Sequence, residues 1–155
     1  MNHLKKGEAL GQDIRVLQQQ LGRAYLKLRA WAEAEAAFQR ELEVDEDNPS
    51  SHHGLAVALL HQHRNEEAAE HCLRAIGLAQ NMPLAHYHLG LALFRLGQEE
   101  RAILALENSL RMKKDLLNAH RLLALLYKER DPEKAQAHSA LQKTARHPTK
   151  APYVV

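Results

Sequence analysis

The sequence predicts an all-α protein built from four similar helical hairpins in a row. Three observations predict it: a repeat of 34 residues, the helical spacing of apolar residues within each repeat, and an aromatic content of only 5%, so that a core must rest on alanine and leucine. With 155 residues the chain is long enough for one domain that buries about two-thirds of its unfolded surface.

Large and small residues recur at fixed positions of four windows that start at Arg15, Pro49, Pro83 and Leu117. The seventh position is leucine (Leu21, Leu55, Leu89, Leu123), the eighth is small (Gly22, Ala56, Gly90, Ala124), and the twentieth is alanine (Ala34, Ala68, Ala102 and, after a one-residue deletion, Ala135). Small residues let paired helices approach each other closely. The pattern therefore predicts tightly packed hairpins.

Within each window the apolar residues follow the period of a helix, as the third window illustrates. Leu89, Leu93 and Leu96 have the i, i+4, i+7 spacing of one helical face, and Gly97 interrupts the pattern. A second stripe follows over residues 102–110. Each window is therefore predicted to contain two helices joined by a turn.

The predicted elements follow in order along the chain. First helices are predicted near 13–28, 49–62, 83–96 and 117–129, and second helices near 31–45, 65–78, 99–112 and 132–146. The four repeats are predicted to span 15–48, 49–82, 83–116 and 117–146, with an N-terminal lead-in or cap over 1–14 and a C-terminal tail over 147–155. The last helix is polar, as the end cap of a repeat array requires.

This pattern resembles the tetratricopeptide repeat (TPR) family. The segment 85–90, followed by Gly97 and residues 99–103, is similar to the consensus of that family, and so is the segment 21–25 followed by Ala34. The resemblance implies a right-handed α-α superhelix of four helix-turn-helix repeats, without strands, and a non-catalytic protein–protein interaction module.

Histidine is the compositional oddity, with 11 residues. His52, His86 and His120 occupy the position that is usually Trp or Leu in the family. Equivalent positions on neighbouring helices are about 8–10 Å apart or more, whereas the nitrogen ligands of one zinc ion lie within about 4 Å of one another. We therefore expect packing or interhelical hydrogen bonds and no metal site. Adventitious metal binding stays open at His61 and His63.

Motifs of catalysis and cofactor binding are absent from the sequence. It contains no glycine-rich phosphate loop, no H-E-x-x-H zinc motif and no G-x-S-x-G nucleophile elbow. The single cysteine, Cys72, excludes a disulfide framework within the chain and fills a packing position of the repeat. The sequence therefore predicts neither an enzyme nor a cofactor.

Charge and hydropathy bear on location and partners. The net charge of +2 does not indicate a nucleic-acid partner, and no apolar run approaches the length of a transmembrane helix. The first thirty residues lack an apolar signal-peptide core. The expected location is the cytoplasm.

The resemblance also implies a binding surface, because family members hold peptides in a concave groove lined by the first helices. The residues that match groove positions and that we predict to bind a partner are Arg23, Lys27, His53, Val57, Leu60, Tyr87, Leu91, Phe94, Arg95, Arg121, Leu125 and Lys128. A basic rim beside an apolar strip favours a peptide or protein with apolar anchors and acidic groups or a free carboxylate. The carboxylate clamp that some members use for chaperone tails is not matched.

Three alternatives remain open at this point. The chain is comparable in size to dimerising TPR chaperones of bacterial secretion systems, which would make it a homo-oligomer. It is also similar to repeat tails of some bacterial phosphatase or phosphodiesterase-type enzymes. RNA binding is the last alternative. Separately, residues 151–155 are an apolar segment of the kind that this groove would suit.

Overall fold

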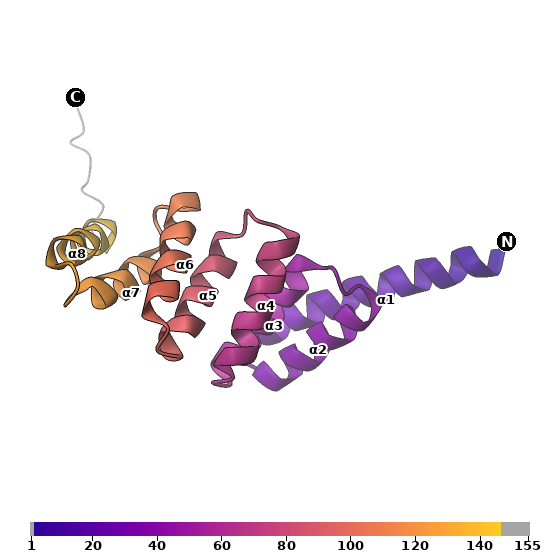
Figure 1. Cartoon of the computed structure of the whole chain (residues 1–155). Helices are drawn as coiled ribbons and strands as arrows, with labels where there is room; N and C mark the ends of the chain where they lie inside the picture. Colours follow the sequence, from indigo (N-terminus) through magenta and orange to yellow (C-terminus); the bar gives the residue numbers. More distant parts are fainter. Residues whose placement is uncertain (1, 147–155) are drawn as a thin grey trace, which may run out of the picture.

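The computed structural model describes residues 2–146, and within that range it contains eight helices and no strand. The helices are α1 (Asn2–Lys27), α2 (Trp31–Val44), α3 (Pro49–His61), α4 (Asn65–Leu78), α5 (Pro83–Arg95), α6 (Glu99–Met112), α7 (Leu117–Tyr127) and α8 (Pro132–Arg146). They stack in chain order, so α1 and α8 form the two ends of the array (Figure 1). None of them is long and apolar enough to cross a membrane. The predicted tail 147–155 lies outside the described residues.

Successive helices pair as antiparallel hairpins joined by turns of the same kind. Arg29, His63 and Gly97, which are 34 residues apart, all have positive φ values of 58°, 61° and 74°. This left-handed conformation ends a helix and reverses the chain, and only one of the three turns uses the glycine that adopts it without strain. The shared turn geometry fixes the angle within the first three hairpins.

The helix ranges agree with the predicted ones to within two residues, except at the start of α1. The sequence predicted a helix from about residue 13, but α1 begins at Asn2 and runs through Gly7 and Gly11. A glycine inside a helix costs only about 0.5–1 kcal/mol relative to alanine, so two of them weaken the helix without ending it. Residues 2–12 are therefore helical rather than a frayed lead-in.

Small residues on the first helices make room for large ones on the second. Phe38 of α2 lies between Gly22 of α1 and Gly54 of α3, where an added Cβ would come within 2.7 Å and 2.3 Å of the phenyl ring. Gly90 of α5 accommodates Leu106 of α6 in the same way, at 2.6 Å. The core is consequently a single row of alanine and leucine contacts that continues through the stack.

Candidate functional site

The first helices α1, α3, α5 and α7 form one side of the array, which we call the first-helix face. A pocket of about 240 Å³ lies on it between α5 and α7, lined by Tyr87, Leu91, Asn118, Arg121, Leu122 and Leu125. Leu125 is 56% exposed there, while Tyr87 and Leu91 are partly buried against the core. An exposed guanidinium thus stands beside an apolar floor.

Burial raises the pKa of the Tyr87 hydroxyl, although Arg95 and Arg121 nearby lower it. The phenol is therefore protonated at neutral pH and is available as a hydrogen-bond donor at the edge of the pocket.

Basic residues are distributed along the first-helix face, from α1 to α7 and the residue that follows it. Arg23, Lys27, Arg121 and Lys128 are exposed, and no ion pair among the described residues involves them. Arg95 is exposed as well, but its Nη1 donates to the backbone carbonyl of Leu60 at 2.8 Å, which holds the guanidinium over the end of α3. The positive charges are therefore open to solvent.

One predicted groove residue does not belong to this surface. Leu60 is only 2% exposed and packs in the core, so its side chain cannot contact a ligand. Only its backbone carbonyl reaches the surface, where Arg95 binds it. Val57 and Phe94 are partly exposed. His53 is partly exposed too, but its Nε2 lies 2.9 Å from Nδ1 of His88, so its ring is already held.

Two further histidine pairs join the helices within one repeat. The Nδ1 atoms of His52 and His71 are 2.9 Å apart, and those of His120 and His138 are 2.8 Å apart. The ring centroids are 5.2 Å and 5.1 Å apart, and the ring planes are inclined by 25° and 41°. Each pair links the first helix of a repeat to the second.

The tautomers of these pairs follow from a further contact that each first-helix histidine makes through its Nε2. The Nε2 atoms of His52 and His120 lie 2.8 Å from the backbone carbonyls of Glu46 and Lys114. A carbonyl only accepts, so each Nε2 carries the proton and each Nδ1 accepts from the partner histidine. The histidines therefore serve interhelical hydrogen bonding, and the described residues contain no group of three or more metal ligands that could hold an ion. The sequence did not indicate these two pairs, because His71 lies 19 residues from His52, and His138 lies 18 residues from His120, each on the second helix of its repeat.

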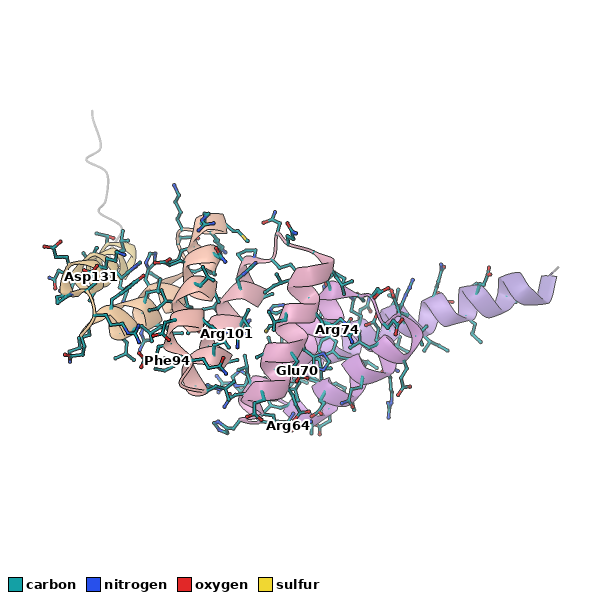
Figure 2. The ribbon with its side chains drawn as sticks, in the orientation of Figure 1. Arg64, Glu70, Arg74, Phe94, Arg101 and Asp131 are labelled. Atoms are coloured by element: carbon teal, nitrogen blue, oxygen red, sulfur yellow. The ribbon has the colours of Figure 1, made fainter. Side chains whose placement is uncertain are left out.

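A second surface lies on the side of the second helices. A pocket of about 510 Å³ is lined in part by Glu43, Glu46, Glu70 and Arg74, the last two of which are on α4 (Figure 2). At the nearby turn Arg64 pairs with Glu35 and Glu67 at 2.6 Å each. This side of the molecule therefore carries more carboxylates than the first-helix face.

Cys72 is a packing residue. It is fully buried, and burial raises the pKa of its thiol to about 12. The thiolate that a nucleophile or metal ligand requires is therefore not formed at neutral pH.

Comparison with known families decides the classification. Two family models, each described as tetratricopeptide repeat, match residues 20–83 and 84–116, together more than half of the chain. The chain belongs to the TPR family. The all-α superhelix predicted from the sequence is thereby confirmed, and three similar proteins show how widely this fold is used.

A curated relative, the TPR repeat-containing thioredoxin TTL4 of Arabidopsis thaliana, is 35% identical over 72 residues, which is 46% of this chain and 11% of that protein. This chain thus corresponds to a small part of that relative. The first TPR domain of Spaghetti (RPAP3), bound to the HSP90 peptide SRMEEVD, is similar with a TM-score of 0.72 and 22% identity, over 75% of this chain and 92% of that one.

An O-GlcNAc transferase mutant of Thermobaculum terrenum has a TM-score of 0.79 and 24% identity, over 88% of this chain and 26% of that one. At these identities the two solved structures establish the shared TPR fold and nothing more.

Proposed function

We propose that this TPR chain is a non-catalytic interaction module that binds a peptide or protein partner on its first-helix face. The observation that carries the proposal is the pocket of Tyr87, Leu91 and Leu125 with Arg121 at its side. Exposed apolar side chains supply affinity when a partner buries them, and fixed charges orient the partner. The peptide-bound TPR domain of RPAP3 supports a peptide as the kind of ligand.

The charges of the first-helix face favour a partner with acidic groups or a free carboxylate beside its apolar anchors. Arg23, Arg95, Arg121 and Lys128 present positive charge to solvent. A partner rich in lysine would be repelled from the same surface. The residues of the chaperone-tail clamp are absent, so the proposed ligand is distinct from those tails.

The test is fluorescence anisotropy with short labelled peptides that carry leucine or phenylalanine anchors, glutamates and a free C-terminal carboxylate. Arg121→Glu should weaken binding roughly tenfold, about 1.4 kcal/mol, because it replaces attraction by repulsion at the pocket. Arg121 is the sharper choice over Arg95, whose hydrogen bond to Leu60 also supports the fold.

The matched control is Arg101→Glu, which makes the same charge change on α6, away from the first-helix face. Arg101→Glu should leave the anisotropy titration unchanged. The melting temperature of both variants should equal that of the native chain. Equal binding by the native chain and Arg121→Glu would remove the first-helix face as the site.

A second candidate is that this chain is the repeat region of a larger enzyme. It is favoured by the coverage of only 26% of the O-GlcNAc transferase chain and 11% of the TPR thioredoxin. The two candidates are compatible, since a repeat region binds substrates or partners for the enzyme that carries it. The coding sequence on either side of this segment shows directly whether an enzyme domain adjoins it.

A further inference from the structure

An apolar stripe runs along α1 from Leu10 to the end of the helix, and no other helix of the described residues covers it. It comprises Leu10, Ile14, Leu17, Leu21, Ala24 and Leu28, the last just after the helix ends, with spacings that alternate between four and three residues. This alternation is the seam of a coiled coil. Leu10, Leu17 and Leu28 are 63%, 53% and 75% exposed.

Three of these positions, those of Leu17, Leu21 and Ala24, are buried in every later repeat. Leu17 and Leu21 correspond, 34 residues on, to Ser51 and Leu55 of α3, which are 0% and 2% exposed. Gly54, beside Leu55, meets Phe38 of the preceding hairpin, so this side of a first helix faces the repeat before it. Among the described residues no helix packs on this side of α1, and Leu17 stands where the later repeats have Ser51, Ala85 and Ala119.

The first half of α1 also lacks neighbours within its own chain. Figure 1 shows it projecting beyond α2, and the ion pair of Arg15 with Asp45 at 3.0 Å ties α1 to the residue that follows α2. A Cβ added at Gly7 or Gly11 would meet nothing within 4 Å, and the first turn contains no acidic residue that would stabilise it. Because an isolated helix of this length is marginal in water, the projecting half needs a covering surface.

We propose that α1 pairs antiparallel with α1 of a second copy of this chain, about a two-fold axis near residue 19. In this register the numbers of paired residues add to 38, and every layer is apolar: Leu10 meets the partner's Leu28, Ile14 meets the partner's Ala24, and Leu17 meets the partner's Leu21. One stripe thus supplies both halves of the interface, as a two-fold interface requires.

Charge complementarity supports this register. The residues that flank the stripe on one side are Asp13, Gln20 and Lys27. Antiparallel pairing places Asp13 beside the partner's Lys27, twice by symmetry, and Gln20 beside its own copy. Asp13 and Lys27 are exposed, and no ion pair among the described residues uses either.

The alternatives leave these charges unpaired. A shift by one heptad places Asp13 beside glutamine and removes the partners of Ala24 and Leu28. A parallel pair places Asp13 beside the partner's Gln18. Stacking of α8 on α1 is disfavoured because α8 is polar, with Gln136, Ser139 and Gln142 among its residues, and so offers the leucines of α1 little apolar surface. The full antiparallel pair is therefore the arrangement that satisfies both the stripe and the charges.

Sedimentation equilibrium of the chain over a range of concentrations tests the proposal, and a dimer is the expected result. The double variant Ile14→Glu/Leu17→Glu should sediment as a monomer and keep a cooperative thermal transition, since both side chains are exposed in the single chain. The control Leu73→Glu/Leu104→Glu changes two exposed leucines of α4 and α6 and should remain dimeric. A monomeric native chain, or a dimer that survives the α1 variant, overturns the proposal.

Charge reversal tests the register. Asp13→Lys and Lys27→Asp should each raise the dimer dissociation constant roughly fivefold, because the two-fold axis doubles the number of ion pairs that each substitution removes. The double variant reverses both charges and should return the dissociation constant to the native value. Gln20→Cys should form a disulfide across the axis under oxidising conditions, while the buried Cys72 does not react. A double variant whose dissociation constant stays above the native value overturns the antiparallel register. Binding of acidic peptides at Arg121 is measured separately, so its failure would leave this result intact.

Discussion

At the scale of single residues, the fold depends on which side chains are missing. Phe38 fits between α1 and α3 because Gly22 and Gly54 have no Cβ there. The repeat predicted the glycine or alanine at the eighth position of each window, but it did not single out Gly54, whose counterparts are Gln20, His88 and Leu122. Its role depends on Phe38 of the preceding hairpin.

Gly54→Ala should destabilise the chain by about 1–3 kcal/mol, because the new methyl group would lie 2.3 Å from the Phe38 ring in a fully packed core. Urea unfolding followed by circular dichroism measures the change. Gly77→Ala is the matched control, since Gly77 of α4 has nothing within 4 Å and alanine there should stabilise the helix by about 0.5–1 kcal/mol. Equal effects of the two substitutions would contradict the close contact.

His88 should make the chain sensitive to acid. Burial, and to a smaller extent His53 and His61, lower its pKa to about 3, against 6.5 for an ordinary histidine. Below pH 6.5 the unfolded chain binds a proton that the folded chain refuses, so this residue lowers the free energy of unfolding as the pH falls toward 3.

The slope from this residue approaches about 1.4 kcal/mol per pH unit, and His88→Gln should remove it. Urea unfolding at pH 7, 6, 5 and 4 supplies the comparison. A His88→Gln slope equal to the native one would show that the ring titrates normally in the folded state.

At the scale of helices, the sequence predicted where most elements begin and end, because Pro49, Pro83 and Gly97 mark the boundaries. It did not predict how far α1 extends, because Gly7 and Gly11 weaken the helical pattern before residue 13. It also placed Leu60 in the groove, because position along a helix does not reveal which neighbour covers a side chain. Which helix covers a given side chain follows only from the three-dimensional structure.

The start of α3 has a side-chain cap that the starts of α2, α4, α5, α6 and α7 lack. Oδ1 of Asn48 accepts from the backbone N–H groups of Ser50 and Ser51 at 3.0 Å and 3.2 Å, and its Nδ2 donates to the buried Glu41 at 2.9 Å. Asn48→Ala should cost about 1–2 kcal/mol, because it removes the cap and leaves the carboxylate of Glu41 without its donor.

The melting temperature by differential scanning calorimetry reports this loss. Gln98→Ala is the control, since Gln98 precedes α6 at the equivalent place and caps no backbone N–H. Its melting temperature should stay near that of the native chain. An Asn48→Ala variant as stable as Gln98→Ala would show that water replaces the amide at no cost.

At the scale of the whole molecule, the two ends of the array differ in character. The α1 end is apolar and the α8 end is polar, although both are ends of one array of similar repeats. The sequence showed the polar end, because Gln136 and Ser139 interrupt the repeat pattern. It did not show the apolar end, since Leu17 and Leu21 look like ordinary core positions until their neighbours are known to be missing.

The turns that contain Arg29, His63 and Gly97 have a consequence for how the array tolerates change. Since each helix packs on the one before it, an angular change at one of these turns is passed on to every later helix. One extra residue in such a turn would therefore rotate all the helices that follow it, whereas residues added beyond either end of the array would leave the packing of the helices unchanged. Evolutionary insertions should accordingly accumulate at the ends of the array and avoid these turns.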